Sequence, residues 1–351
     1  MINYRQIEYI ENDCSIILDG QLNTLNDLQN QAIYISGASG FVGKWIIELV
    51  NYLNKFHSFN IKVIASSSSI KQGLKLFPHI FNKKEILLVE KDIKNITDVD
   101  SQVTYVIHLA GSPDNRNYAS NPVKAMNDIV IGTSQLLNAC SRLENLKKVM
   151  YYSTGHVYGV QPIDSANITE SCFYNFDSSS CANFYAEAKR VGESLMNAYR
   201  SQFKLPVIIL RPFAFIGPYQ LLNRPWAVNN FIRDGLNGQQ IRILGDAKTV
   251  RSYMYPSEMA LWTLRSLLNN SDETVFNLGS SDGMDLNSIA QIIEHNFGGN
   301  LGVSKNVMPD SLKQSKFVPS VEKFEQVFDV KLKISTEAAL KKAIEWYQLE
   351  N

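Results

Sequence analysis

Short apolar runs that alternate with helical patterns constrain the fold of this chain most strongly. The runs are rich in Val, Ile and Tyr, and their apolar residues are continuous, as expected for strands covered on both faces. They are AIYIS (32–36), IKVIAS (61–66), ILLVE (86–90), YVIHLA (105–110), KVMYYS (148–153) and PVIILR (206–211). Helical patterns such as FVGKWIIELVNYLNK and AMNDIVIGTSQLLNACSRL separate them. This alternation predicts an α/β fold with a doubly wound parallel sheet.

The rhythm of the chain breaks after about residue 212. Helical pieces such as AVNNFIRDGLNG and LNSIAQIIEHNFG then mix with the short strand patterns IRILG and VFNLG, which indicates a smaller α+β lobe. We therefore expect a dinucleotide-binding domain over 32–212 and a smaller lobe over 213–351, with some chain exchange between them. Residues 1–31 form an N-terminal extension, compatible with a short helix, to which the sequence assigns no chemistry.

Composition narrows the possible partners. Of 351 residues 45% are hydrophobic, and 34 basic side chains balance 34 acidic ones, so no broad charge footprint for nucleic acid or an anionic membrane is expected. No apolar run approaches the length of a membrane span, and the start lacks a signal-peptide pattern. Four scattered cysteines without metal-ligand spacing indicate free thiols and no metal site. A cytoplasmic protein is the expectation.

A glycine triplet follows the first apolar run directly. The stretch YISGASGFVGKW places Gly37, Gly40 and Gly43 after a predicted strand and at the start of a predicted helix. Glycines there allow a tight turn, a close backbone approach to a pyrophosphate and close helix–strand packing, and the helix N-terminus faces the phosphate charge. The surrounding strand–helix context predicts a dinucleotide site.

The choice between NAD and NADP depends on the end of the second strand. An NAD site usually has an acidic residue there to hold the ribose hydroxyls. The chain instead reads VIASSSSIKQG, with Ser66, Ser67 and Lys71, and small hydroxyls beside a cation favour the 2′-phosphate of NADP. Asp92 after the third strand is placed to meet the adenine, although a solvated turn aspartate is an equal alternative.

Tyr185 and Lys189 lie one helical turn apart in YAEAK, on one face of a predicted helix. A lysine cation beside a phenol lowers the phenol's pKa, so that tyrosinate can take a proton from a sugar hydroxyl as hydride leaves carbon. Thr154, at the end of the fifth apolar run, is placed to share that proton. These three residues predict hydride-transfer chemistry on an alcohol.

Over roughly residues 32–300, the sequence resembles the extended short-chain dehydrogenase/reductase family, specifically its nucleotide-sugar epimerases and dehydratases. The motifs are GASGFVG, HLAG (108–111), STGHVYG (153–159), YAEAK (185–189), LRPFAFIGPYQ (210–220) and VRSYMY (250–255). The resemblance implies a Rossmann-type sheet, an NDP-sugar bound by the second lobe and a homodimer formed through helices at 123–142 and 183–202. It also implies a role in polysaccharide biosynthesis.

The resemblance assigns residues to each part of the site. The implied catalytic residues are Thr154, Tyr185 and Lys189, with His156 as a further candidate. The implied cofactor contacts are Gly37, Ser39, Gly40, Phe41, Val42, Gly43, Ser66, Ser67, Lys71, Asp92, Ile93, Leu109, Ala110, Gly111, Ser153, Tyr185, Lys189 and Pro212. The implied substrate contacts are Ser112, Thr154, His156, Phe213 and Arg251, whose guanidinium suits a diphosphate. His108 is expected to support the cofactor loop.

Several positions depart from the family pattern. Ala214 and Ile129 stand where relatives usually carry Asn. Relatives that dehydrate the sugar carry Asp-Glu where this chain has Gly155 and His156, which disfavours a 4,6-dehydratase. Relatives that epimerise at C3 and C5 carry a Cys acid or base at the position of His156. Imidazole can do proton work at a carbon beside a 4-keto group, or His156 can simply hydrogen-bond the sugar.

The resulting expectation is an NAD(P)-dependent epimerase that acts by oxidation and reduction at C4 of an NDP-sugar. The alternative is an NADPH-dependent reductase of a 4-keto sugar. A 4,6-dehydratase, a C3/C5-epimerase and a non-catalytic dinucleotide sensor rank below these, and the intact set of Thr154, Tyr185 and Lys189 speaks against the sensor.

Overall fold

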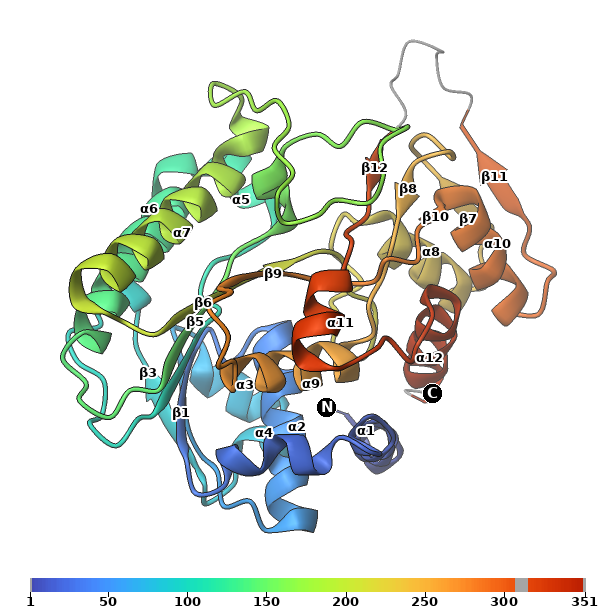
Figure 1. Ribbon diagram of the computed structural model, residues 1–351. Coiled ribbons are helices and arrows are strands. Elements are labelled where there is room, and N and C mark those ends of the chain that lie inside the picture. The colour runs from blue at the N-terminus through green and yellow to red at the C-terminus, as the bar shows by residue number, and fades with distance from the viewer. Residues whose placement is uncertain (1, 307–314, 350–351) are drawn as a thin grey trace.

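Seven parallel strands form the central sheet of the computed structural model, which describes residues 2–306 and 315–349 (Figure 1). The strand order is β3-β2-β1-β4-β5-β6-β9. The bounds are β1 (Ala32–Ser36), β2 (Lys62–Ser67), β3 (Ile86–Glu90), β4 (Tyr105–His108), β5 (Lys148–Tyr152), β6 (Val207–Pro212) and β9 (Val275–Leu278). The first six coincide closely with the predicted apolar runs. The predicted α/β class and its Rossmann-like parallel sheet are confirmed.

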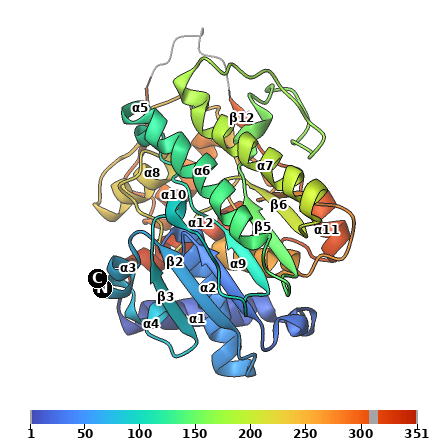
Figure 2. The same cartoon turned by 90° about the vertical axis from the view of Figure 1, so that its left-hand side faces the viewer.

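Helices cover both faces of this sheet. On one face lie α2 (Phe41–His57) and α9 (Pro256–Leu267), and on the other α6 (Pro122–Cys140) and α7 (Phe184–Phe203) run side by side (Figure 2). Neighbouring strand residues point to opposite faces. Ile33 and Ile35 join the buried cluster of α2 and α9, whereas Tyr34 joins that of α6 and α7. Because both faces are buried, the strands are apolar throughout.

The strand order reverses beside β1, which lies between β2 and β4. Ser36 at the end of β1 is in register with Ser66 on one side and His108 on the other. The loops that follow β1 and β4 therefore leave the sheet side by side. In open α/β sheets, ligands bind at the carboxyl ends of the strands at such a reversal.

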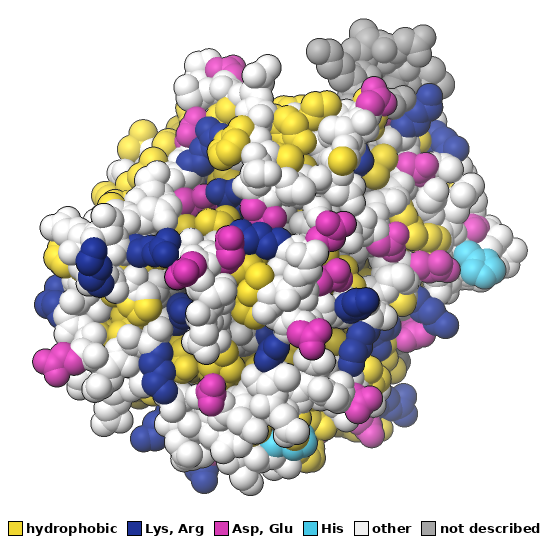
Figure 3. All heavy atoms as spheres, in the orientation of Figure 1, with side chains coloured by type: hydrophobic (Ala, Val, Ile, Leu, Met, Phe, Trp, Pro, Cys, Tyr) yellow, Lys and Arg dark blue, Asp and Glu magenta, His cyan; other side chains and the backbone are white. Residues whose placement is uncertain are grey.

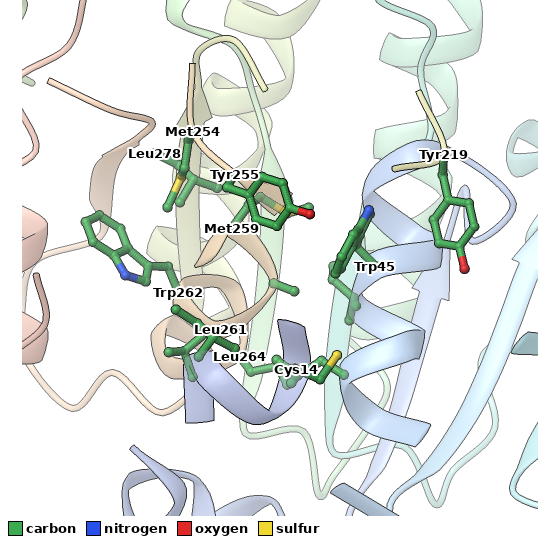
Figure 4. Packing of buried hydrophobic residues seen from close by; sticks show 14 of the residues in the cluster. Cys14, Trp45, Tyr219, Met254, Tyr255, Met259, Leu261, Trp262, Leu264 and Leu278 are labelled. Carbon is green, nitrogen blue, oxygen red and sulfur yellow. The ribbon is translucent and has the colours of Figure 1, made fainter. Parts of the chain in front are cut away.

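The N-terminal extension forms α1 (Tyr4–Leu18) and a 3-10 helix, η1 (Leu22–Leu28). Apolar residues of α1, Cys14 among them, pack with Trp45 of α2 and Leu261 of α9 (Figure 4). The carboxylate of Asp13, buried in this layer, accepts a hydrogen bond from Tyr255 Oη at 2.5 Å and lies 2.6 Å from Lys342 Nζ. The extension is therefore part of the core and ties the chain's beginning to its end.

The rest of the chain builds the smaller lobe around helices and short strands. The helices are α8 (Ala227–Leu236), α10 (Leu286–Asn296) and α12 (Thr336–Gln348), whereas α11 (Glu322–Phe328) returns to the large sheet and packs through Phe324 on β9 and α9. The strands are β7 (Ile241–Ile243), β8 (Val250–Arg251), β10 (Met284–Asp285), β11 (Val303–Lys305) and β12 (Lys316–Phe317), paired in the orders β10-β8-β12 and β11-β7.

One predicted element lies in a different layer from the one expected. VFNLG was assigned to the smaller lobe, but it forms β9, which pairs in parallel with β6 and extends the large sheet. Helix α9 also returns to cover that sheet. Residue 212 is therefore not a clean boundary, since the chain leaves the main domain, returns to it and leaves again.

On the face shown in Figure 3, Lys and Arg side chains are interspersed with Asp and Glu. Within residues 2–306 and 315–349, no helix is both long and apolar enough to span a bilayer.

Candidate active site

The glycine loop after β1 lies directly against the loop after β4. Gly37 has φ +72°, and a Cβ there would come within 3.0 Å of Ala110 N and 3.1 Å of Leu109 C. A Cβ on Gly43 would lie 2.5 Å from the carbonyl oxygen of Ala38. Only glycine fits either position. These two glycines hold the backbone turn close to its neighbours.

Helix α2 begins at this turn with an open N-terminus. Gly40 is its N-cap and provides no side-chain hydrogen bond, and Phe41 and Val42 begin the first turn. The first backbone N–H groups of a helix have no partner within the helix and attract anions. The loop and this helix end together fit a dinucleotide pyrophosphate, as the sequence predicted.

Serine hydroxyls connect the loops after β1 and β2. Ser39 Oγ lies 2.7 Å from Ser67 Oγ and 3.0 Å from Ser69 Oγ. Ser66, at the end of the β2 core, is buried. The hydroxyl cluster lies where an acidic residue would hold the ribose in an NAD site.

Lys71 is engaged by an acidic residue that the sequence reading overlooked. Glu90 pairs in register with Ser67, and its carboxylate accepts the Lys71 backbone N–H at 3.0 Å and lies 3.3 Å from Lys71 Nζ. The hydrogen bond from the Lys71 backbone lowers the pKa of Glu90. No carboxylate stands at the end of the second strand itself, but strand pairing brings the carboxylate of Glu90 there from the third strand.

Asp92 and Ile93 lie in the turn that follows Glu90 at the end of β3. The Asp92 carboxylate caps the 3-10 turn η2 (Ile93–Asn95) and accepts the Lys94 backbone N–H at 2.9 Å. Ile93 packs toward α6, close enough to contact a Cβ at Gly132. The Asp92 carboxylate is thus held locally by its own turn.

His108 ties the cofactor loop to the sheet. Its Nδ1 lies 2.7 Å from Ser36 Oγ, and its Nε2 lies 3.0 Å from Thr133 Oγ1 on α6. Ser36 Oγ also accepts the backbone N–H groups of Leu109 and Ala110. Burial lowers the pKa of His108 to about 3, so the ring is neutral and serves as a hydrogen-bonding strut under the loop.

Thr154, Tyr185 and Lys189 are brought together at the carboxyl end of β5. Thr154 follows the strand directly, and its hydroxyl interacts with the Tyr185 phenol, which lowers the phenol's pKa. Burial is the larger effect and raises the pKa of Tyr185 overall. Lys189 Nζ donates to the Tyr152 carbonyl oxygen at 2.6 Å. Thr154 and Tyr185 therefore lie together beside the end of β5, which Lys189 also reaches, but the expected lowering of the Tyr185 pKa by Lys189 is not found, because burial raises it.

Burial dominates the electrostatics of Lys189, whose side chain is among the buried polar groups. Desolvation lowers its pKa to about 7, and the negative charge of Glu193 partly opposes this. Its ammonium lies 4.8 Å above the Tyr151 ring. Gly192 leaves room for that ring, because a Cβ there would lie 2.0 Å from Tyr151 Oη.

Glu193 and Arg211 form a buried ion pair that sequence reasoning missed. Arg211 Nη2 lies 2.6 Å from Glu193 Oε2 and its Nε donates to Oε1 at 2.9 Å. Ser153 Oγ also donates to Glu193. Glu193 lies four residues after Lys189, so the helix period could have placed it on the same face. Arg211 belongs to the LRP motif and could have suggested the pair.

The ring of His156 stacks on Phe317. The centroids lie 4.7 Å apart and the planes differ by 9°. Its backbone N–H donates to Thr154 Oγ1 at 3.3 Å and its carbonyl oxygen accepts from the Gly159 N–H at 3.1 Å, whereas its side chain makes no hydrogen bond to the described part of the chain. Protein atoms crowded around the ring and then the positive charge of Arg251 lower the pKa of His156, so the imidazole is neutral at pH 7 although part of its side chain is exposed.

Two aromatic rings leave room only for glycine at position 155. A Cβ at this position would lie 2.8 Å from ring carbons of both Phe213 and Phe317. The position at which dehydrating relatives carry Asp therefore has no space for a side chain. The structure gives a steric reason for the departure noted in the sequence.

Arg251 lies at the edge of this aromatic group. Its guanidinium donates to Val250 O at 2.8 Å, to Ser315 O at 3.2 Å and to Ser315 Oγ at 3.1 Å. Phe213 follows Pro212 at the end of β6 and stacks on Phe317. Arg251 is within electrostatic reach of His156, so the expected substrate contacts from both lobes face one region.

A second charged group borders the site. The Tyr118 hydroxyl donates a hydrogen bond to the carbonyl oxygen of Ser112 at 2.9 Å. The Tyr118 ring lies 5.3 Å from the ring of Tyr185. In the same loop, buried Asp114 pairs with Arg116 and with Arg224 of the smaller lobe. The Arg116 hydrogen bond lowers the pKa of Asp114 to about 2. Only the fold brings Arg224 here.

The two departures from the family pattern have local explanations. Ile129 is buried beside Gly111, whose φ of +134° and close approach to Ile129 leave no room for a Cβ. Ile129 thus makes an apolar contact where a polar amide is usual. At Ala214 the backbone carbonyl oxygen accepts the Met254 N–H at 3.0 Å, and the methyl side chain offers no polar group to the site.

A parallel sheet with a phosphate-accommodating glycine turn and a polar cluster at its carboxyl edge defines a dinucleotide-dependent enzyme class. Residues 33–279 match the model of the NAD dependent epimerase/dehydratase family, and the chain belongs to that family. This confirms the resemblance, and the chain is an enzyme of this group.

Curated relatives are similar over most of the chain. UDP-glucuronic acid decarboxylase 1 of Xenopus tropicalis is 24% identical over 328 residues, 93% of this chain and 74% of that protein. UDP-glucuronic acid decarboxylase 3 of Arabidopsis thaliana is 26% identical over 314 residues, 89% of this chain and 87% of that protein.

Solved structures share the fold. A UDP-N-acetylglucosamine 4-epimerase from Methanobrevibacter ruminantium, in complex with UDP-N-acetylmuramic acid, has TM-score 0.78 and 21% identity, covering 92% of this chain and 100% of that one. A UDP-glucuronic acid 4-epimerase from Bacillus cereus, in complex with UDP-glucuronic acid and NAD, has TM-score 0.76 and 21% identity over the same shares.

Proposed function

We propose that this enzyme is an NAD(P)-dependent epimerase that oxidises and re-reduces C4 of a UDP-sugar. The observation that carries the proposal is the cluster of Thr154, Tyr185 and Lys189 beside the open glycine turn. The names of the relatives support the substrate class, because they include UDP-sugar 4-epimerases and UDP-glucuronic acid decarboxylases.

Tyr185 is the proposed acid and base at the C4 hydroxyl. A general base must lie within hydrogen-bonding reach of the proton that it takes, and the Thr154 hydroxyl, which interacts with the phenol, would join the same sugar hydroxyl. A protonated Lys189 favours tyrosinate by its charge, although burial favours neutral Lys189 near pH 7. A bound nicotinamide supplies hydride acceptance and return at C4.

The proposed binding residues follow from the geometry. The glycine turn and the start of α2 would hold the pyrophosphate of the dinucleotide, and the hydroxyls of Ser39 and Ser67 would meet its adenosine ribose. Arg251 uses three of its N–H groups internally, which leaves others for the diphosphate of the sugar nucleotide.

The alternative is an NADPH-dependent reductase of a 4-keto sugar. It is supported by the lack of an acidic residue at the end of β2 and by the serine cluster there. Glu90 argues against a 2′-phosphate, because its carboxylate lies against Lys71. Decarboxylation of a UDP-hexuronic acid is a third outcome of C4 oxidation, favoured by the names of the curated relatives.

One substrate screen separates these reactions. UDP-, dTDP-, GDP- and CDP-sugars are incubated with NAD or NADPH, and the products are followed by NMR. An epimerase interconverts C4 isomers without net cofactor consumption, a reductase consumes NADPH with a 4-keto sugar, and a decarboxylase releases carbon dioxide from UDP-glucuronic acid. Turnover of no UDP-sugar would contradict the proposed substrate class.

The assembly and setting are further parts of the proposal. We propose a homodimer through α6 and α7, which expose Val123, Ile131 and Val191. Such apolar side chains on two neighbouring helices suit a helix-to-helix interface. A cytoplasmic place and a role in polysaccharide biosynthesis accord with a UDP-sugar substrate. Light scattering of the purified protein tests the dimer.

A further inference from the structure

Strand β12 (Lys316–Phe317) lies beyond the family match and between the two halves of the site. On one side it pairs in parallel with β8, with Phe317 opposite Arg251. On the other, Lys316 forms a bridge with Gln161, and the Val318 N–H donates to Gln161 Oε1 at 2.9 Å. Figure 1 shows β12 between β8 and the loop that follows β5. The strand therefore joins the smaller lobe to the loop of His156.

Two aromatic rings stack on the half-buried Phe317 ring. One face carries His156 at 4.7 Å, and the ring of Phe213 lies 4.5 Å away at 29°. Its Cζ lies 2.8 Å from the place a Cβ would take at Gly155. These contacts restrict rotation of the Phe317 ring. It holds the imidazole of His156 flat against the aromatic group, with the histidine side chain exposed.

Ser315, directly before β12, restricts the Arg251 side chain through hydrogen bonds. Its carbonyl oxygen and hydroxyl both accept hydrogen bonds from the guanidinium, at 3.2 and 3.1 Å, and Val250 O accepts a third at 2.8 Å. The Val250 N–H in turn donates to Ser315 O at 2.8 Å, so the backbone around this serine is fixed by β8. These acceptors restrict the guanidinium to one direction.

We propose that β12 is a positioning element of the substrate site: Phe317 orients the His156 ring and Ser315 orients the Arg251 guanidinium. One short strand thereby sets the distance between a group expected to meet the sugar and a group expected to meet its diphosphate. The inference rests on the proposed function in taking a UDP-sugar as the ligand of these two residues.

NMR of the ligand-free protein tests the Phe317 half. The chain has five histidines, so the His156 ring signals are assigned by their loss in His156→Gln. Phe317→Leu is expected to move them downfield, because the ring current of the stacked phenyl is lost, and Phe317→Tyr to restore them. Lys316→Ala, on the same strand, is the matched control, since the Lys316 Nζ donates a hydrogen bond to the carbonyl oxygen of Ser165. Unchanged His156 signals in Phe317→Leu would overturn the inference.

Calorimetry with UDP tests the Ser315 half. Ser315→Ala removes one acceptor from Arg251, and we expect about fivefold weaker UDP binding, as for one hydrogen bond. Phe317→Leu should bind UDP as the wild type does but raise KM for the UDP-sugar with kcat retained. Lys316→Ala should change neither. Wild-type UDP affinity in Ser315→Ala would overturn this half.

The two proposals fail separately. If wild-type protein binds neither UDP nor any UDP-sugar, the proposed function is wrong, while the His156 signals still decide the role of Phe317. In that case the Arg251 Nε–H signal, assigned through Arg251→Lys, decides the role of Ser315. A shift of that signal in Ser315→Ala and not in Lys316→Ala supports positioning, and no shift contradicts it.

Discussion

Lys189 Nζ donates a hydrogen bond to the carbonyl oxygen of Tyr152 at 2.6 Å, at a position with almost no solvent exposure. Among the described residues, this ammonium group has one backbone acceptor and one nearby carboxylate, that of Glu193, to offset the loss of water. The side chain proposed to assist catalysis is thus also a burden on the stability of the folded protein.

The cost in stability of burying Lys189 decreases as the pH rises. The pKa of Lys189 falls from about 10.4 in an unfolded chain to about 7 in the fold. Between these values the unfolded chain binds more protons, so stability rises with pH. Lys189→Met should therefore increase the free energy of unfolding at pH 6, by up to on the order of 4 kcal/mol. The gain should shrink by pH 9. Urea unfolding of cofactor-free protein at both pH values measures it, and a pH-independent difference would contradict the assignment.

Tyr185→Phe removes only the phenolic hydroxyl. We expect the fold and the dinucleotide affinity to persist and turnover to fall by several orders of magnitude, because the phenolic hydroxyl is the group proposed to exchange the proton of the C4 hydroxyl. Turnover is measured with the UDP-sugar found in the screen, and affinity by fluorescence titration. If the variant keeps more than a small fraction of the activity, Tyr185 is not the acid or base.

Variants of Lys71 and Glu90 test whether the enzyme prefers NADP or NAD. If Lys71 and the serines meet a 2′-phosphate, NADPH binds more tightly than NADH, and Lys71→Ala weakens only NADPH. Glu90→Gln should then tighten NADPH several-fold by freeing Lys71 from its partner at 3.3 Å and removing a negative charge. Dissociation constants for both cofactors decide this. Equal affinities, or tighter NADH, contradict the NADP preference.

The His156 ring is stacked and neutral, with no side-chain partner among the described residues to relay a proton. We therefore expect no solvent deuterium at C3 or C5 of the product. His156→Ala should mainly weaken substrate binding, by about 1–2 kcal/mol for one lost contact. Carbon-bound deuterium in the wild-type product, absent in His156→Ala, would instead show proton work by the imidazole.

Gly155→Asp introduces the side chain that dehydrating relatives carry. The new Cβ would meet Phe213 and Phe317 at 2.8 Å, so we expect a loss of about 1–3 kcal/mol in stability and no dehydratase activity. Adding Phe317→Ala should recover part of that loss by making space. Chemical denaturation of the single and double variants provides the test, and an unperturbed Gly155→Asp midpoint would show that the loop relaxes.

Patterns local in sequence determined much of this protein. The six apolar runs became six strands because burial on both sheet faces requires continuous apolar residues. The glycine turn was readable because Gly37 and Gly43 occupy places that no Cβ can enter. Tyr185 and Lys189 share a face because the helix period places residues four apart together. In each case neighbours within a few residues set the geometry.

Contacts between distant segments were decided only by the tertiary structure. The last strand of the large sheet, β9, joins β6 across more than sixty residues of chain, and nothing in VFNLG distinguishes it from a strand of the smaller lobe. Glu90 reaches Lys71 through strand pairing, and Arg224 reaches Asp114 from another lobe. Phe317 meets His156 because β12 returns between two lobes. Side-chain type and period do not encode such pairings, since they depend on how whole elements pack around the shared core.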